Sequence, residues 1–249
     1  MARPFLLLGL TGYGYSQVDS QEYVCNHGVG KDTACLALRE VAGDRAEVVQ
    51  LAFASVLKDV AAQLTGIPRA HFDDHHKNRV VARGLSRDLS RQWTPRQVAQ
   101  VLGTEVVRQD LGLSELWQQL LFQQLEELKD PWLAASRKLG VDYRRFREAF
   151  EFRLGRWQSP ARQKPLIVVL TDVRFPNEAL GVKARGGHLV QVRRYRPHVS
   201  PQQHASAQQL QVSADEVVYN DGTPEELGQR LWAVCQRRLA SLREVGMRG

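Results

Sequence analysis

The sequence predicts an α/β protein in which helices flank a doubly wound parallel sheet. Segments rich in β-branched and apolar residues alternate along the chain with segments of helical period, which is typical of parallel strands joined by crossover helices. The strongest strand signal is the unbroken run 166–170, Leu-Ile-Val-Val-Leu, as expected for a central strand covered on both faces. With 249 residues, 43% of them hydrophobic, the chain is long enough for one well-buried core, and we expect a single domain.

Short length and apolar, β-branched composition define the other strands. An apolar run begins at Phe5, reaches Leu10 and ends in Gly12, and two adjacent valines lie within 48–53. Near the C-terminus, two short apolar segments are bounded by glycine-containing turns. The expected strands are therefore 5–10, 48–53, 166–170, 188–192 and 216–219.

Caps and helix breakers define the helices. Thr94 is a typical N-cap and is followed by Pro95 at the first helical position, so a helix is expected from there to Arg108. Gly66 and Pro68 close the helix that precedes them. The expected helices are 30–39, 55–64, 95–108, 115–129, 175–184 and 224–244, with a further helix indicated within 130–165 by an apolar stripe at Phe146, Phe150 and Leu154.

The formal net charge of +7 predicts an anionic partner. Residues 137–164 contain nine Lys or Arg and three Asp or Glu, so one segment carries nearly the whole imbalance. A nucleic-acid-binding protein more often shows a longer basic stripe with interleaved aromatic residues, and we therefore do not expect nucleic acid as a partner. No apolar run approaches the roughly 20 residues that span a bilayer. Three scattered cysteines favour a reducing compartment, so we expect a cytoplasmic protein away from membranes.

Residues 30–33, Gly-Lys-Asp-Thr, follow an apolar strand and open a helix, as in phosphate-binding loops. In such loops, glycines let backbone N–H groups surround phosphate oxygens, the lysine neutralises the β- and γ-phosphates, and the hydroxyl binds Mg²⁺. Taken alone, 30–33 is equally well read as a chance tetrapeptide in a surface turn. The loop residues predicted to bind ATP are Gly12, Gly28, Gly30, Lys31, Asp32 and Thr33.

This loop departs from the usual pattern in two respects. Asp32 separates the lysine from the threonine, and Cys25 stands where the first glycine belongs. The nearest glycine at the end of a strand is Gly12, so about thirteen residues, 13–25, look inserted. The insertion forms either a flap over the nucleotide or an inert excursion, the more common outcome for a surface loop.

Further motifs follow the loop along the chain. They are 9–12 (Gly-Leu-Thr-Gly), 53–54 (Phe-Ala), 57–58 (Leu-Lys), 94–96 (Thr-Pro-Arg), 100–105 (Gln-Val-Leu-Gly-Thr-Glu), Arg108, 172–178 (Asp-Val-Arg-Phe-Pro-Asn-Glu), 204–206 (His-Ala-Ser) and 220–223 (Asn-Asp-Gly-Thr). Together with 30–33, their order and spacing resemble the bacteriophage deoxynucleoside monophosphate kinases, a branch of the P-loop nucleotide kinases. The resemblance covers most of the chain outside 13–25 and 130–160. It departs from the family at Ala207, which replaces the glutamate of His-x-Ser-Glu.

The resemblance implies one P-loop kinase domain with a nucleoside-monophosphate-kinase-like fold. It places the core at about 1–58 and 164–249, the monophosphate-binding region at about 59–130 and a basic lid at about 131–163. It implies ATP and a deoxynucleoside monophosphate as substrates and Mg²⁺ as cofactor. A phage-encoded enzyme would act in the cytoplasm of the infected host cell. For the oligomeric state, a homodimer is one alternative.

Three residues are expected to be catalytic: Lys31, Asp172 and Arg174. Asp172 follows the strongest strand, at the sheet edge where doubly wound folds bind ligands, and we expect it to hold Mg²⁺ with Thr33. Its alternative role is to cap the next helix. Arg174 is expected to hold the acceptor phosphate or the charge of the transition state. The alternative is a salt bridge to Glu178, four residues further on.

The resemblance implies an acceptor-binding set of Phe53, Lys58, Arg79, Arg96, Arg108, Arg174 and Glu178. Arginine suits this task because its planar guanidinium contacts phosphate with two hydrogen bonds. Arg96 and Arg108 are about 3.3 turns apart on one predicted helix, so they need not share a face. The alternatives are solvated helix arginines and, for Phe53, packing in the core.

Two further sets are expected at the donor side. Arginines of the basic segment occupy the place of a lid, which closes over ATP and excludes water, or else form a solvated helix face; they are Arg144, Arg145, Arg147, Arg153 and Arg156. Arg193, Arg194 and Asn220 are expected to border the adenine. The histidines at 71, 75 and 76 lie close to Asp73 and Asp74 but match no metal-site spacing, so we expect a polar loop there.

Three functions remain in view. The leading one is ATP-dependent phosphorylation of deoxynucleoside monophosphates to diphosphates. The second is a related small-molecule P-loop kinase, of the phosphomevalonate or dephospho-coenzyme A type, although 94–96 and 103–105 favour the nucleotide branch. The third is an inactive, basic nucleic-acid-binding module in which the inserted loop has abolished ATP binding.

Overall fold

The computed structural model describes residues 4–18, 21–25, 28–73, 76–80, 82–83, 92–130, 137–138, 140, 142, 164–195 and 213–246. The chain forms two compact units. The first comprises Met1–Leu51 and Gln123–Gly249, and the second comprises Ala52–Phe122. The second unit overlaps the region 59–130 in which the resemblance places acceptor binding.

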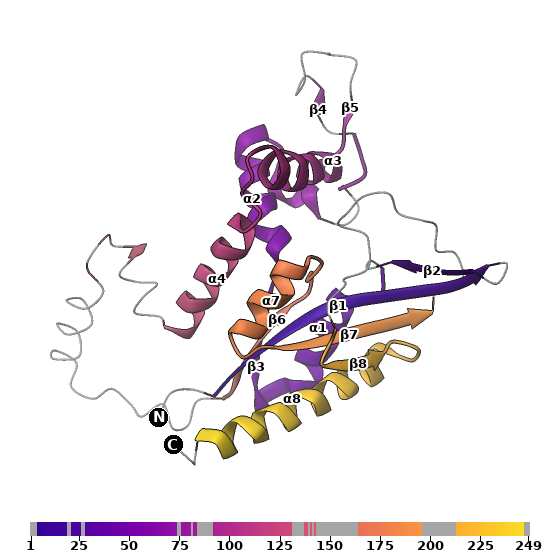
Figure 1. The fold of residues 1–249 in the computed structure, drawn as a ribbon, viewed down its shortest axis with the longest axis vertical. Coiled ribbons are helices and arrows are strands. Elements are labelled where there is room, and N and C mark those ends of the chain that lie inside the picture. The colour runs from indigo at the N-terminus through magenta and orange to yellow at the C-terminus, as the bar shows by residue number, and fades with distance from the viewer. Residues whose placement is uncertain are drawn as a thin grey trace. The chain divides into compact units, whose positions relative to one another are not determined.

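A parallel sheet forms the centre of the first unit. Within the described residues it has five parallel strands in the spatial order β3-β6-β1-β7-β8 (Figure 1). The strands are β1 Phe5–Val18, β3 Glu47–Leu51, β6 Leu166–Leu170, β7 His188–Tyr195 and β8 Glu216–Tyr219. The predicted α/β fold with a parallel sheet is thus confirmed, and each predicted strand is present.

The described part of this unit contains the end of α4 (Leu116–Lys129) and, in full, three helices and a short 3-10 turn. They are α1 Lys31–Ala42, η1 Gly43–Arg45, α7 Pro176–Ala184 and α8 Pro224–Gly246. Their bounds agree with the predicted helices to within three residues at each end. No helix in the described ranges has both the length and the apolar composition needed to cross a bilayer.

Helices cover both faces of the sheet, so the sheet is doubly wound. On one face Leu6, Leu8 and Leu10 of β1 are buried in one cluster with residues of α1 and α8. The side chain of Gly9 would point to the opposite face, where a Cβ would lie 3.2 Å from Val173 and 3.4 Å from Val182 of α7. This alternation is what a strand of period two produces between two helical layers.

The direction of sheet growth reverses at β1. The chain passes from β1 through α1 to β3 on one side, and from β6 through α7 to β7 on the other side of β1. In open α/β sheets, ligands bind outside the carboxyl ends of the strands at such a reversal. The carboxyl ends of β3 and β6 are therefore the place to look for a site.

β1 is longer than the sequence predicts. It continues past Gly12 to Val18 and turns into β2 (Gln21–Cys25), which pairs with it as an antiparallel hairpin. Gly12 lies inside the strand, in register with Val192 of β7, so the predicted strand end at Gly12 is wrong. The residues that look inserted in the phosphate loop thus extend the sheet.

The physical reason for the longer strand is the pairing with β7, which runs beside β1 as far as Tyr195. Aromatic contacts line this extension on one face. The ring centroids of Tyr13 and Tyr15 are 5.9 Å apart, and those of Tyr15 and Tyr195 are 5.7 Å apart. Tyr15 and Tyr195 are opposite each other on β1 and β7, and such cross-strand aromatic pairs stabilise sheets.

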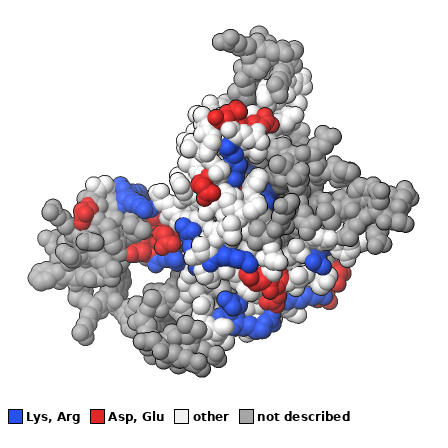
Figure 2. All heavy atoms as spheres, in the orientation of Figure 1, with Lys and Arg blue, Asp and Glu red and all other residues white. Residues whose placement is uncertain are grey.

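Charged side chains protect the edge strand β8. The Arg230 guanidinium donates to the backbone carbonyl of Tyr219 and to the Asp221 carboxylate, and Arg237 donates to Glu216. Figure 2 shows basic and acidic side chains interspersed along the lower part of the molecule, where Figure 1 places α8 and β8. Such charges discourage pairing of the open edge with another strand.

The second unit is helical, with one small two-stranded sheet among its described residues. It contains α2 Phe53–Thr65, η2 Arg69–Phe72, β4 Ala82–Arg83, β5 Gln92–Trp93, α3 Pro95–Gln100 and η3 Val101–Asp110, and α4 Leu116–Lys129 begins in it. The predicted cap at Thr94 is confirmed, because its hydroxyl accepts from the Gln97 N–H at 3.2 Å while Gln97 Oε1 accepts from the Thr94 N–H.

The second half of the predicted helix 95–108 is a π-helix over Val101–Asp110. The separation of about 3.3 turns between Arg96 and Arg108, which assumes the 3.6 residues per turn of an α-helix, therefore does not apply. Gly103 explains part of the change: a Cβ there would lie 2.4 Å from Leu57 Cδ2, and the Trp117 indole N–H donates to its carbonyl at 3.1 Å. Both contacts depend on tertiary packing, which the hydrophobic periodicity of the sequence does not predict.

Cys35 and Cys235 are free thiols in the core between α1 and α8. Burial raises the pKa of Cys35 to about 11 and the pKa of Cys235 to about 12. Both thiols therefore stay protonated at neutral pH and act as small apolar side chains.

The contact between α1 and α8 gives a direct test of this packing at Gly228. A Cβ there would lie 2.6 Å from the carbonyl oxygen of Ala37 and 2.9 Å from Val41 Cγ2. Because backbone atoms cannot move aside alone, Gly228→Ala is expected to lower the free energy of unfolding by about 1–3 kcal/mol in urea titration. Gln229→Ala, at the exposed next position, is the control and should change it by less than about 0.5 kcal/mol. Equal effects would contradict the close packing.

Candidate functional site

Two glycines with left-handed backbone turn the chain into α1. Gly28 has φ 67°, and Gly30, the N-cap of α1, has φ 89°. Residues with a Cβ rarely adopt these values. The Ala34 N–H donates to the Gly30 carbonyl at 2.8 Å and begins the helix. Lys31 is therefore the first residue of α1, and it is only 8% exposed.

Asn220 supports this turn from the end of β8. Its side-chain N–H donates to the carbonyl of Val29 at 2.8 Å, and its backbone N–H donates to the carbonyl of Arg193 at 2.7 Å. A Cβ on Gly30 would lie 2.5 Å from Asn220 Nδ2. Asn220, expected to border adenine, thus has a positioning role: it fixes the turn that precedes Lys31.

Gln50 joins the N-terminus of α1 to the carboxyl ends of two strands. From β3 it donates to Asp32 Oδ1 at 2.8 Å and to Thr171 Oγ1 at 3.1 Å. Thr171 and Asp172 follow β6 directly. The network brings the predicted residues of the phosphate loop and the predicted metal ligand Asp172 to the same edge of the sheet.

Two of the predicted site residues differ in solvent exposure. Thr33, in the first turn of α1, is exposed and so is accessible to a ligand, whereas Asp172 is buried. Gln50 and Thr171 were not among the predicted site residues. A polar Gln within the otherwise apolar segment 48–53 was the available signal for Gln50, since an amide there needs a partner.

The segment after β6 is held by Glu178. The buried Glu178 carboxylate accepts from the backbone N–H groups of Arg174 and Phe175 at 2.9 and 3.1 Å. Glu178, expected to bind substrate, therefore fixes the backbone of Arg174 and opens α7. The predicted alternative of Asp172 as the helix cap is not seen, because Phe175 is the N-cap.

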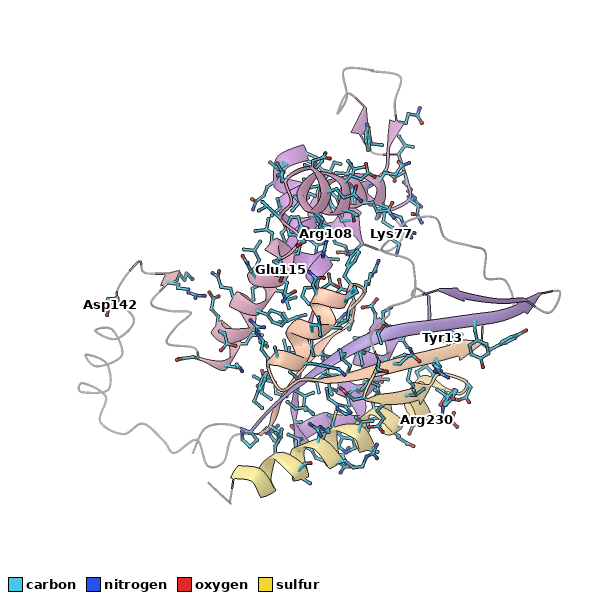
Figure 3. The ribbon with its side chains drawn as sticks, in the orientation of Figure 1. Tyr13, Lys77, Arg108, Glu115, Asp142 and Arg230 are labelled. Atoms are coloured by element: carbon cyan, nitrogen blue, oxygen red, sulfur yellow. The ribbon has the colours of Figure 1, made fainter. Side chains whose placement is uncertain are left out.

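Arg193 lies on the face of β7 that carries the aromatic extension. Its guanidinium is stacked 4.8 Å from the ring centroid of Tyr13, which Figure 3 labels on β1, and its Nε donates to Gln191 at 2.7 Å. Arg194 is exposed. Successive side chains of a strand point to opposite faces, so these two arginines do not act on one ligand face.

In the second unit, two predicted acceptor residues have structural partners. Phe53 is buried and packs edge-to-face on Phe122, with ring centroids 6.0 Å apart, so it is a core residue. Lys58 forms an ion pair of 2.6 Å with Asp73. Burial would raise the pKa of Asp73, but hydrogen bonds from Lys58 and Arg69 outweigh it and hold that pKa below its ordinary value.

Three of the four predicted acceptor arginines, all except Arg174, are described in the same unit. Arg79 and Arg96 are exposed, and the Arg96 N–H donates to the carbonyl of Lys77 at 3.0 Å. Arg108 is half-buried, with Nη1 donating to the carbonyl of Ser114 at 3.1 Å. Exposed guanidinium groups are available for phosphate contact, so acceptor binding by Arg79 and Arg96 stays a prediction.

Several predicted sets lie outside the described residues. They are the lid arginines 144, 145, 147, 153 and 156 and the motif 204–206. The histidine-rich loop is described in part: the His71 and His76 rings stack with centroids 4.9 Å apart. Across the described ranges, no group of three or more His, Cys, Asp or Glu is placed to hold a metal ion.

Comparison with known proteins adds no relative. No protein-family model matches the chain, and no curated protein matches it. The interpretation of the site therefore rests on its geometry and on the motif resemblance.

The turn before α1 gives a test by double-mutant cycle. Gly30→Ala introduces left-handed strain and a clash with Asn220, whereas Gly186→Ala, at φ 69° with nothing within 4 Å, introduces strain alone. We expect Gly186→Ala to cost about 1–2 kcal/mol of unfolding free energy and Gly30→Ala to cost more. Adding Asn220→Ala to Gly30→Ala should recover the difference, giving a coupling energy of about 0.5–3 kcal/mol in urea titrations. Additive effects would show that Asn220 does not support the turn.

Proposed function

We propose that the chain is a P-loop-type kinase that transfers the γ-phosphoryl group of ATP to a deoxynucleoside monophosphate. The observation that carries this is the buried Lys31 at the first position of α1. The N-terminus of a helix carries partial positive charge, and a lysine at the first position adds a full charge, so the start of α1 is suited to a highly charged anion. A nucleotide polyphosphate is such an anion.

The shape of the turn supports the same proposal. Glycine suits position 30 because its φ is left-handed and Asn220 Nδ2 lies 2.5 Å from the place of a Cβ. The N–H groups of a first helical turn lack intrahelical partners. The cradle is shorter than the usual loop, because β1 continues as a strand past Gly12.

The oxygen donors at this edge fit Mg²⁺, a hard cation that takes oxygen ligands. Thr33 and Asp172 are the residues that would hold it: one follows Lys31 in the first turn of α1, the other follows β6. When bound, Mg²⁺ neutralises charge on the β- and γ-phosphate oxygens.

The chemical step is a substitution at phosphorus without a covalent enzyme intermediate. An oxygen of the acceptor phosphate attacks the γ-phosphorus of ATP, the bond from that phosphorus to the β–γ bridging oxygen breaks, and ADP leaves with the electron pair. Lys31 neutralises the leaving phosphates, and Arg174 holds the charge of the acceptor phosphate. The resemblance also assigns Arg96 and Arg108 to the acceptor.

The parallel, doubly wound sheet is compatible with the nucleoside-monophosphate-kinase-like fold that we propose. The reversal at β1 and the loop 28–33 coincide at one edge. Fold-level likeness alone does not select a reaction, so the proposal is supported by Lys31 at the start of α1 and not by the sheet.

Replacing Lys31 tests the proposal. Lys31→Ala should lower kcat/KM for phosphoryl transfer by about 10²–10³-fold, because one preorganised charge at the transferring group is lost. The circular dichroism spectrum should be unchanged. Lys164→Ala is the matched control: its exposed ion pair with Asp44 lies on the surface, and such pairs contribute little. Full turnover of Lys31→Ala would contradict the cradle.

A panel of acceptors separates the proposal from its alternatives. ATP consumption with deoxynucleoside monophosphates, and not with phosphomevalonate or dephospho-coenzyme A, is the expected result. Turnover with either of the latter would assign the small-molecule branch. Duplex binding that weakens steeply with salt, with no nucleotide affinity, would identify a nucleic-acid-binding module.

A further inference from the structure

Two buried polar atoms, one on β1 and one in the segment that follows β6, have no hydrogen-bond partner within the described structure. They are the hydroxyl of Thr11, a residue only 1% exposed, and Nε of Arg174. Native proteins pair nearly all such atoms, so each unpaired one requires an explanation. The proposed function so far gives Thr11 no role.

Thr11 and Asp172 each lie two residues beyond the point where the pairing of β1 with β6 ends. The two strands are parallel, and their last pair is Gly9 opposite Leu170. Val173 packs over Gly9 on the sheet face opposite α1, 3.2 Å from the position of a Cβ there. Thr11 points to the same face as Gly9, because side chains alternate along a strand. Its hydroxyl therefore lies on the side of the sheet that 172–174 covers.

A second buried threonine at this edge shows what pairing normally looks like. Thr171 is 3% exposed, and its hydroxyl accepts a hydrogen bond from Gln50 at 3.1 Å. Thr11, of the same residue type and burial, has no such partner. A buried hydroxyl without a partner lowers stability, and valine of the same shape would avoid that cost. The presence of threonine and not valine at position 11 is explained if the hydroxyl binds a ligand.

We propose that the Thr11 hydroxyl and Arg174 Nε–H donate hydrogen bonds to one phosphate group, that of the phosphoryl acceptor. The inference rests on the proposed function and adds a binding residue to it. Both atoms can donate, one belongs to a permanent cation, and phosphate oxygens accept several hydrogen bonds at once. The Glu178 carboxylate accepts a hydrogen bond from the backbone N–H of Arg174, which keeps the Arg174 residue at this edge. Access to Thr11 requires side-chain movement, since it is buried.

Thr11→Val tests this because it removes the hydroxyl and preserves the shape. We expect the melting temperature of the ligand-free protein to stay level or rise, while KM for the acceptor rises about tenfold or more, as for a lost hydrogen bond to a charged group. KM for ATP should not change. Thr11→Ser, which keeps the hydroxyl, should restore acceptor binding. Thr171→Val is the matched control for stability and should lower the melting temperature by about 2–4 °C.

A second arm does not depend on turnover. In the Lys31→Ala background, in which the α1 cradle is disabled, inorganic phosphate should raise the melting temperature, and adding Thr11→Val should abolish that rise. Loss of stability in Thr11→Val, an unchanged acceptor KM, or a phosphate response that is absent or insensitive to Thr11→Val would each overturn the inference. If no acceptor is phosphorylated by the unaltered protein, the proposed function fails, while the phosphate arm still decides the role of Thr11.

Discussion

The position of a buried lysine at the positive end of a helix is the constraint on which the rest of the site depends. Lys31 is the first residue of α1 and is 8% exposed, and the helix dipole disfavours a cation at this end. The surrounding structure is built to keep it there. Gly30 supplies the left-handed turn, Asn220 holds that turn, and Gln50 ties the first turn of α1 to β6. A position that breaks a local rule and is supported from several elements is typical of a functional site.

The proposed phosphate loop differs from the usual one in length. In the usual pattern the loop leaves directly from the end of the first strand. Here β1 runs on to Val18 and returns through β2, so the proposed cradle consists only of the turn at 28–30 and the first turn of α1. The long β1–β7 pairing and its aromatic contacts carry the hairpin, and the sheet rather than a flexible excursion accommodates the extra residues.

Much of the fold could be predicted because local signals agreed with the tertiary structure. The run 166–170 forms β6, an interior strand of the sheet that is buried throughout, and Thr94 with Pro95 begins α3 as expected. The extension of β1, the π-helix and the supporting role of Asn220 could not be predicted, because each depends on a partner far away in sequence. β7 extends β1, Trp117 takes up the carbonyl of Gly103, and Val29 lies 191 residues from Asn220. Phe53 is a core residue for the same reason, because its partner is the ring of Phe122.

The most direct measurement is a crystal structure of the protein with a non-hydrolysable ATP analogue and Mg²⁺. The account predicts that the β- and γ-phosphates accept hydrogen bonds from the backbone N–H groups of 30–33 and lie against Lys31 Nζ. A triphosphate bound elsewhere, with the turn before α1 closed against it, would contradict the account.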